Sequence, residues 1–279
     1  MGDSFLTADG LALSRPRLVA AGAARGTVLI VHGLGEHKGR YEQVAATLAA
    51  QGWRVVATTS AAMAEPGPRG AIPDDEALLR DLAAVIDALR AERGGPLLLL
   101  GHSMGGLVAA RFVAEGLRSP PAAWARPVEA LVLSSPALAG RHECRAEAAA
   151  GHTLGRLAPG LAVNNGLKPE WISRDAAVVA AYVADPLVHE RITPRLARFI
   201  LDGGELVRHL APLWRVPTLL LWAGADRCVA PRGSAAFAQA APPGMVQAQV
   251  FPALYHEIFN EPERAQVLER LLAGLRALA

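Results

Sequence analysis

The sequence predicts an α/β fold, in which helices cover both faces of a mostly parallel sheet. Short apolar runs rich in Val and Leu alternate along the chain with longer helical patterns, and this alternation is typical of parallel strands that are buried on both faces. The length of 279 residues suits one such domain with an insertion better than two independent domains.

The expected strands begin with a hairpin that turns at Asp9-Gly10, a dipeptide that favours tight turns. Six further strands follow, and each is a short run rich in Val or Leu. They are expected at residues 27–32, 53–58, 96–101, 128–134, 217–223 and 246–251.

The amphipathic stretches between these runs predict the covering helices. They lie at residues 41–50, 74–93, 104–117, 234–240 and 262–278. In the last of them four leucines recur at helical spacing, which marks a face buried in the core: Leu268, Leu271, Leu272 and Leu275.

One segment, residues 137–213, breaks the alternation. It holds helix-like pieces at 153–162 and 194–206 and no clear strand. We therefore expect a helical cap at 137–213, inserted into an α/β core that residues 1–136 and 214–279 form together.

Charge and cysteine usage exclude several classes of protein. The formal net charge of +2 is too small for a surface that tracks nucleic acid. Cys144 and Cys228 lie far apart and predict two free buried thiols rather than a disulfide framework. The first ten residues carry no apolar run, and no segment reaches the roughly twenty apolar residues of a membrane span, so we expect a cytoplasmic protein.

A nucleophile is predicted at Ser103. The segment Gly101-His102-Ser103-Met104-Gly105 follows an apolar run and opens a helical pattern, which is the strand, turn and helix context of the Gly-x-Ser-x-Gly elbow. The two glycines are needed because the serine occupies a sharp turn packed against the neighbouring strand and helix.

An oxyanion hole is expected beside this serine. His32-Gly33-Leu34-Gly35 follows an earlier strand, at the place where the second donor of such a hole arises. We expect the backbone N–H groups of Leu34 and Met104 to stabilise the negative charge that develops on a carbonyl oxygen in the transition state.

The partners of the serine are expected downstream in the order acid, then histidine. Asp226 and His256 each stand just beyond an expected strand, and catalytic groups gather outside the carboxyl ends of strands in open α/β sheets. Asp185 or Asp202 could replace Asp226, but both lie in the insertion, where helix capping or solvation is the more ordinary role.

No metal or cofactor is expected. The remaining histidines form no compact ligand set: His32, His37, His102, His142, His152, His189 and His209. We expect His32 and His102 to orient loops through hydrogen bonds and the histidines of the insertion to lie at the surface.

These motifs resemble the monoacylglycerol lipase and lysophospholipase branch of the α/β-hydrolase superfamily. The resemblance spans nearly the whole chain. Its motifs are His32-Gly33-Leu34-Gly35-Glu36-His37 with Arg40-Tyr41, Gly101 to Gly106, Ser173-Arg174-Asp175, Asp185-Pro186-Leu187-Val188-His189, Gly224-Ala225-Asp226-Arg227, and His256-Glu257 with Asn260-Glu261.

The resemblance implies that the insertion is a mobile cap that guides an acyl chain towards the serine and could bring the protein briefly to a membrane surface. An apolar stripe agrees with this role but is equally ordinary core: Leu154, Leu157, Leu161 and Val163. The resemblance also implies that Glu36, with Arg40, holds the polar glycerol end of the substrate. The alternative is an ion pair that steadies the loop.

One segment departs from the family pattern. Relatives carry Asp-x-x-Gly-His-Gly-x-Ser after the second long strand, whereas this chain reads Thr59-Ser60-Ala61-Ala62-Met63-Ala64-Glu65-Pro66. Small apolar residues cannot replace the hydrogen bonds that brace the nucleophile loops. The hypothesis is a looser site with reduced turnover.

The sequence thus predicts a serine hydrolase that cleaves a monoacylglycerol or a similar single-chain ester through an acyl-enzyme. Two alternatives stay open. One is a general carboxylesterase or aminopeptidase on the same scaffold, because the fold and triad do not fix the leaving group. The other is a weakened, ligand-binding pseudoenzyme. A serine at the elbow excludes hydrolases that use an aspartate nucleophile.

Overall fold

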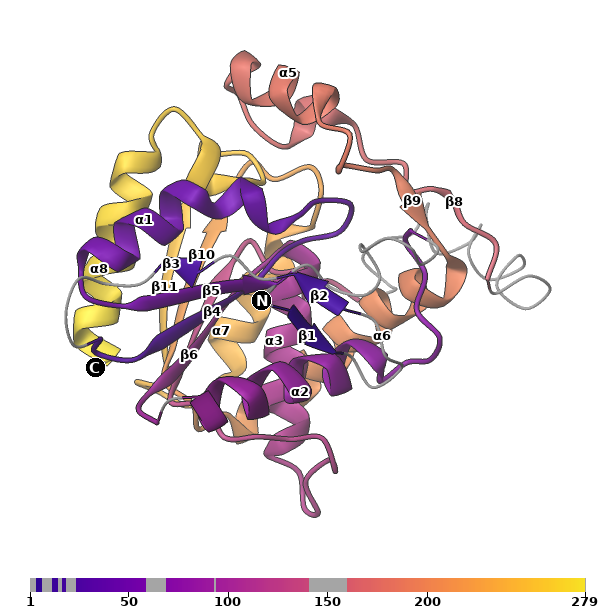
Figure 1. Cartoon of the computed structure of the whole chain (residues 1–279). Coiled ribbons are helices and arrows are strands. Elements are labelled where there is room, and N and C mark those ends of the chain that lie inside the picture. The colour runs from indigo at the N-terminus through magenta and orange to yellow at the C-terminus, as the bar shows by residue number, and fades with distance from the viewer. Residues whose placement is uncertain are drawn as a thin grey trace.

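A seven-stranded sheet organises the molecule, with strand order β11-β10-β7-β6-β4-β5-β3 (Figure 1). The computed structural model describes residues 24–58, 69–92, 94–140 and 160–278, together with the backbone of three short strands before residue 24. All neighbouring strands run parallel except β3, which pairs antiparallel with β5 at one edge. The strands are β3 Arg17–Leu18, β4 Thr27–Val31, β5 Arg54–Thr58, β6 Leu97–His102, β7 Ala130–Ser134, β10 Thr218–Ala223 and β11 Val246–Phe251.

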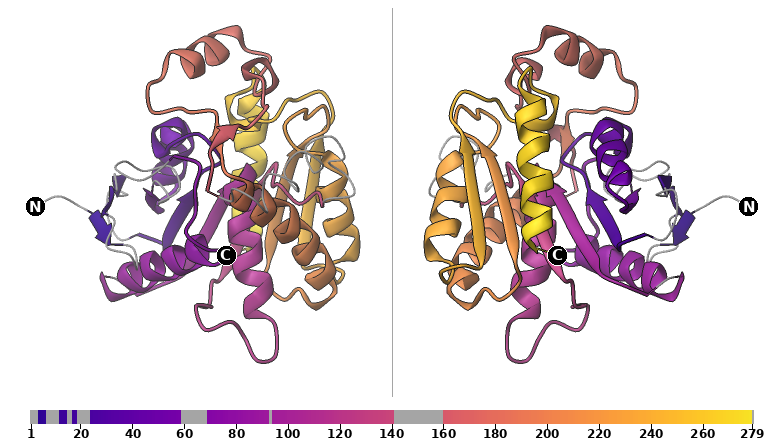
Figure 2. Two further views of the ribbon diagram at one scale, coloured as in Figure 1. Left: turned by 90° about the vertical axis from the view of Figure 1, so that its right-hand side faces the viewer. Right: turned by 90° about the vertical axis from the view of Figure 1, so that its left-hand side faces the viewer.

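Helices cover both faces of this sheet, so the core divides into two layers (Figures 1 and 2). Alternate side chains of one strand point to opposite faces, and in β6 Leu97 and Leu99 join one buried cluster while Leu98 and Leu100 join the other. The first layer contains α2 Ala77–Glu92, α3 Ser103–Gly116, α6 Pro194–Leu210 and α7 Pro231–Ala240, and the second contains α1 Glu42–Ala50 and α8 Arg264–Leu278.

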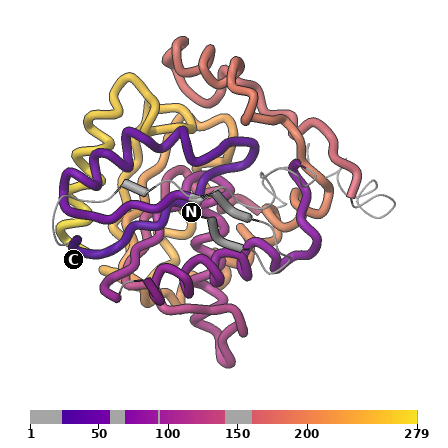
Figure 3. Tube along the Cα trace, in the orientation of Figure 1, coloured from indigo at the N-terminus to yellow at the C-terminus, as the bar shows by residue number. Residues whose placement is uncertain are grey.

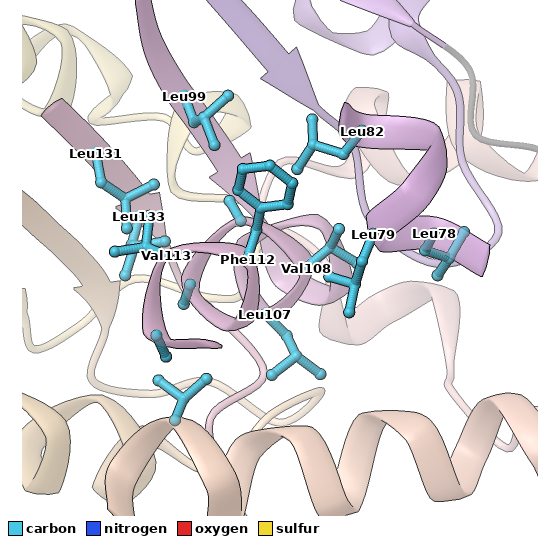
Figure 4. Close-up of a cluster of buried hydrophobic side chains, with 14 of the residues drawn as sticks. Leu78, Leu79, Leu82, Leu99, Leu107, Val108, Phe112, Val113, Leu131 and Leu133 are labelled. Carbon is cyan, nitrogen blue, oxygen red and sulfur yellow. The ribbon is translucent and has the colours of Figure 1, made fainter. Parts of the chain in front are cut away.

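Helix α3 lies at the centre of the first layer, between the sheet and α6. Figure 4 shows Leu107, Val108 and Phe112 of this helix packed among leucines of α2 and of the strands. Phe112 is 1% exposed. Because the nucleophile is predicted at the first residue of α3, this packing fixes the serine on a helix in which eleven of fourteen residues are buried.

The predicted α/β fold is confirmed. The six expected strands of the sheet begin and end within two residues of the observed ones, whereas the edge strand β3 was not expected. Helix α7 begins earlier than expected, because Pro231 and Arg232 form its first turn and proline is well tolerated there. The expected hairpin turn at Asp9-Gly10, the helix-like piece at 153–162 and the unusual segment from Thr59 to Pro66 lie outside the described residues.

The insertion differs from the prediction in two ways. It contains a two-residue antiparallel pair, β8 Val163–Asn164 with β9 Arg191–Ile192, which is too short to leave a strand pattern in the sequence. Its last helix, α6, buries Leu196, Phe199 and Val207 in the first core layer. In its described part, only the segment 160–192 stands away from the sheet, with the helix α5 Ala176–Ala184 at its tip (Figure 3).

The expectation that the histidines of the insertion lie at the surface is wrong for His189, which is 8% exposed. Its backbone N–H donates to the Gly35 carbonyl at 3.0 Å, so the packing of this segment against the neighbouring loop covers the imidazole. Within the described part of the chain, no helix is both long and apolar enough to cross a bilayer.

Candidate active site

Ser103 sits at a strained turn between β6 and α3. Its φ angle is +54°, a conformation that costs a non-glycine residue about 1–3 kcal/mol. A Cβ on Gly105 would collide with the backbone oxygens of Val31 and His32, and one on Gly101 would collide with Gly105. Glycines are therefore required on both sides of the serine, as the elbow motif predicts.

The structure brings Ser103, His256 and Asp226 into one hydrogen-bonded row. His256 Nε2 lies 2.8 Å from Ser103 Oγ, and His256 Nδ1 lies 2.7 Å from Asp226 Oδ2. Asp226 stands just beyond β10 and His256 beyond β11, so the carboxyl ends of three parallel strands carry the three groups. This geometry allows an imidazole held by a carboxylate to accept the serine proton.

The carboxylate of Asp226 is fixed by the backbone that follows it. Its Oδ1 accepts hydrogen bonds from the N–H groups of Cys228 at 2.8 Å and Val229 at 3.0 Å, which leaves Oδ2 for His256. The alternative acid Asp185 is engaged elsewhere, because its Oδ2 lies 2.7 Å from His37 Nε2. Asp202 is an exposed residue of α6.

The electrostatic surroundings of His256 favour its protonated form. Burial lowers the pKa of His256, but the negative charge of Asp226, their hydrogen bond and the neighbouring Glu257 outweigh it, and the pKa lies above its ordinary value. An imidazole tuned in this way is a stronger base, which suits a group that must hold the serine proton during acyl transfer.

The neighbouring His102 packs against His256 and is uncharged. Its ring packs against the His256 ring with centroids 4.7 Å apart, and its Nδ1 lies 3.1 Å from Ser134 Oγ. Burial, together with the charge of His256, lowers the pKa of His102 to about 4. His102 is therefore uncharged at neutral pH, and its hydrogen bond agrees with the expected orienting role.

The loop that should supply the oxyanion hole lies against the serine. A Cβ on Gly33 would be 3.1 Å from the Ser103 Cβ, so the backbone of Gly33 lies close to the nucleophile. The N–H of Leu34 belongs to the next residue of this loop. Leu34 N–H has no acceptor among the described residues. Met104 N–H is in the first turn of α3, where helix N–H groups lack an intrahelical acceptor.

Glu36 and Arg40 are placed beneath this loop, with protein partners of their own. Glu36 is 5% exposed, and its Oε1 accepts hydrogen bonds from the Gly33 N–H at 2.5 Å and the Tyr41 hydroxyl at 2.6 Å. Arg40 donates to Glu257 Oε2 at 2.5 Å. These contacts favour the alternative of an ion pair that steadies the loop over direct substrate contact.

The segment 160–192 is anchored at two places on the catalytic loops. On one side, the Glu257 N–H donates to the Ile172 carbonyl at 2.8 Å, and the fully buried Glu261 accepts from the backbone N–H and the Nε of Arg174, each at 2.6 Å. On the other side, Asp185 and His189 bind the loop at residues 35–37. Glu261 belongs to the motif Asn260-Glu261, but nothing in the sequence alone indicates this structural role.

A small pocket opens onto Ser103 and His256. The core contributes Gly33, Leu34 and His102 to its wall. The segment 160–192 contributes the opposite wall, which mixes apolar and polar side chains: Asn165, Leu167, Lys168, Pro169, Ile172, Tyr182 and Glu190.

One group of metal-ligating side chains exists among the described residues, and it overlaps the catalytic row. Ligand atoms of Asp226, Cys228 and His256 lie within 4.8 Å of one another. Cys228 is a free, half-buried thiol, and burial with the nearby Asp226 charge raises its pKa. The aspartate and histidine already bond to each other, so the cluster is explained by the row itself.

Together, the strained serine on a strand-to-helix turn and the row that follows it define a serine ester hydrolase with an α/β-hydrolase fold. A family model described as serine aminopeptidase, S33, matches residues 22–263. The chain belongs to this family of α/β hydrolases.

Several relatives carry lipase or phospholipase names. The chain is 35% identical to a monoacylglycerol lipase of Mycolicibacterium smegmatis, covering 88% of this chain and 86% of that protein. It is 32% identical to a Bacillus subtilis phospholipase, covering 87% and 92%. The crystal structure of a monoacylglycerol lipase from Paleococcus ferrophilus superimposes with a TM-score of 0.83 at 32% identity, covering 96% of this chain and all of that one.

Proposed function

We propose that Ser103, His256 and Asp226 hydrolyse a single-chain carboxylic ester, with a monoacylglycerol as the first candidate substrate. The observation that supports this assignment most strongly is the row of hydrogen bonds at 2.8 and 2.7 Å, which ends on a strained serine that lines a pocket. The names of the relatives support an ester of glycerol with one acyl chain.

In the proposed reaction, Ser103 Oγ attacks the ester carbonyl carbon while His256 Nε2 takes the hydroxyl proton. The backbone N–H groups of Leu34 and Met104 stabilise the oxyanion. The tetrahedral intermediate then breaks its bond to the alcohol oxygen, which leaves with the proton from His256. Water, deprotonated by His256, attacks the acyl-enzyme, and the carboxylic acid departs as Ser103 regains its proton.

The proposed cap is residues 137–213, of which the described segment 160–192 forms the outer wall of the cavity. Large apolar side chains lie exposed on this segment: Leu161, Val163, Val183 and Leu187. Leu161 and Val163 were part of the stripe expected from the sequence, whereas Leu154 and Leu157 lie outside the described residues. This exposed set is where a lipid surface would meet the protein.

A fluorophosphonate probe tests the nucleophile. The wild-type protein should be labelled stoichiometrically at Ser103, as located by peptide mass spectrometry, and Ser103→Ala should stay unlabelled while keeping its fold by circular dichroism. Wild-type protein without any label would reject the enzyme and favour the binding-protein alternative.

A substrate panel then tests the leaving group. Monoacylglycerols of several chain lengths should be hydrolysed with higher kcat/KM than simple short esters, lysophospholipids or aminoacyl amides. A preference for the amides would support the aminopeptidase alternative, and a preference for lysophospholipids would support a phospholipase like the Bacillus relative.

A further inference from the structure

Two loops must keep a fixed separation for the proposed reaction, and one buried side chain spans them. The oxyanion loop (residues 32–37) follows β4, and the histidine loop (residues 252–261) follows β11. Arg40 lies between them: its Nε is 3.3 Å from Glu36 Oε2 and its terminal nitrogen is 2.5 Å from Glu257 Oε2. Glu36 and Glu257 come from opposite ends of the chain.

On the first side, Glu36 transmits the position of Arg40 to the oxyanion loop. Its Oε1 accepts the Gly33 N–H at 2.5 Å, one residue before the proposed donor Leu34. Its Oε2 is the oxygen that faces Arg40. Within the described part of the chain Arg40 Nε makes no hydrogen bond, so the contact with Glu36 is an ion pair. The attraction between the two buried charges couples the guanidinium to the carboxylate that holds this loop.

On the second side, Glu257 transmits the position of Arg40 to the histidine loop. It directly follows His256, and its Oε2 also accepts from Asn260 Nδ2 at 2.7 Å. Its backbone N–H is fixed on Ile172 O at 2.8 Å. The carboxylate is thus held by its own loop and by Arg40 at the same time.

The charges of this cluster are almost removed from solvent. The side chains of Arg40, Glu36 and Glu257 are 9%, 6% and 6% exposed, and the ring of Tyr182 from the cap covers the guanidinium with its centroid 4.8 Å from Cζ. Burying charges is costly compared with apolar packing, so stability alone does not account for the cluster.

Arg40 also stands behind the cavity wall. Glu36 and Glu257 line the cavity beside Ser103, whereas Arg40 does not. Its polar contacts are with protein carboxylates and an aromatic ring. Direct substrate binding, which the family resemblance implied for this residue, would need this cover to be removed.

We propose that Arg40 is a positioning residue that sets the separation between the oxyanion loop and the histidine loop by bridging Glu36 and Glu257. This inference rests on the proposed catalytic roles of Ser103 and His256. The guanidinium suits the task because its charge is spread over a rigid plane. One terminal nitrogen donates to Glu257, while Nε lies within ion-pair distance of Glu36.

The test compares Arg40→Met, Arg40→Lys and the double variant Arg40→Met with Glu257→Gln. We expect Arg40→Met to lower kcat on a soluble ester about a hundredfold with KM unchanged, because a misplacement of about 1 Å is enough for such a loss. Arg40→Lys keeps the positive charge but loses the planar guanidinium with its several N–H groups. We therefore expect kcat to fall about tenfold with little change in the melting temperature.

The double variant distinguishes a positioning role of Arg40 from a role in neutralising the buried carboxylates. It removes the repulsion between two buried carboxylates, so it should regain much of the melting temperature lost in Arg40→Met while kcat stays low. Arg54→Met is the matched control, because Arg54 is also buried and paired with Glu92 but lies at the opposite end of its strand. It should lower the melting temperature and leave kcat intact.

Three results would overturn the inference. In the first, the Arg40 variants keep kcat within about twofold of wild type. In the second, the double variant restores kcat, so that Arg40 only neutralises charge. In the third, KM rises with kcat unchanged, which is the signature of substrate binding. Failure of the wild-type protein to react with the fluorophosphonate would instead reject the catalytic assignment itself.

Discussion

Helices α3 and α5 are both largely apolar, yet one is buried in the core and the other projects into solvent. In α3, eleven residues are buried, whereas in α5, with the sequence AAVVAAYVA, none is. Val183 of α5 is 66% exposed. Apolar composition therefore does not decide burial in this protein. The connections decide it, because α3 continues directly from a central strand while α5 is fastened near its two ends.

The core and the segment 160–192 also contribute different groups to the site. The core supplies Ser103, His256, Asp226 and the two proposed oxyanion donors from strand ends, the loop after β4 and the first turn of α3. The segment 160–192, which belongs to the proposed cap, supplies a wall of the pocket and the ring of Tyr182. Changes in the core should therefore affect rate or stability strongly, and changes on the outer face of the cap should affect both weakly.

The largest effect is expected for Asp226→Asn, which should lower kcat about ten-thousandfold because an amide holds the imidazole in the wrong tautomer. Steady-state kinetics on a soluble ester measure it. The matched change Asp185→Asn in the cap should keep kcat within about tenfold of wild type. Equal losses of kcat in the two variants would mean that Asp185 is as important for catalysis as Asp226, and the assignment of the catalytic acid to the core would be wrong.

The next effect is on stability, for Phe112→Ala in α3. Removing a nearly fully buried aromatic ring from a packed core should lower the free energy of unfolding by about 3–5 kcal/mol. Urea unfolding followed by circular dichroism measures the change. A loss below about 1 kcal/mol would show that the centre of the first layer is loosely packed, and the contrast with α5 would lose its basis.

A smaller effect is expected in the pH profile. His256 must be neutral to take the serine proton, so kcat/KM should rise with pH along a limb whose apparent pKa lies above the ordinary value of 6.5, since the charge and hydrogen bond of Asp226 outweigh burial. Glu257 also raises the pKa of His256. Glu257→Gln should therefore move this limb to lower pH.

The raised pKa of His256 also affects the stability of the fold, which should change with pH in the direction opposite to activity. Because the folded-state pKa of His256 is raised, the stabilisation from its charged form is fully present below the unfolded value and is lost as pH rises through the folded value. The site should gain activity over the range in which the fold loses this contribution. If the rising limb of the kcat/KM pH profile stays at the same pH in Glu257→Gln, the charge of Glu257 does not influence the pKa of His256.

The smallest effect is expected for Val183→Ser in α5. The side chain is exposed, so the free energy of unfolding should change by no more than about 0.5 kcal/mol, measured by the same urea titration as Phe112→Ala. A loss of several kcal/mol would mean that α5 is packed against protein in solution, and the two helices would then differ less than their exposures indicate.

The sequence by itself determined the sheet, because a strand buried on both faces leaves a local apolar run that can be read without knowing its neighbours. It also determined the order of Ser103, Asp226 and His256, since each follows such a run. The strained turn at Ser103 was predictable for the same reason, as its flanking glycines are adjacent in the chain.

The tertiary structure alone decided the contacts between distant segments. Arg40 meets Glu257, 217 positions away, and no periodicity links them. The burial of α6 in the core, the exposure of α5 and the two anchors of the cap also depend on where other segments pack. Local propensity sets an element and its apolar face, but which surface that face meets is fixed only when the whole chain has folded.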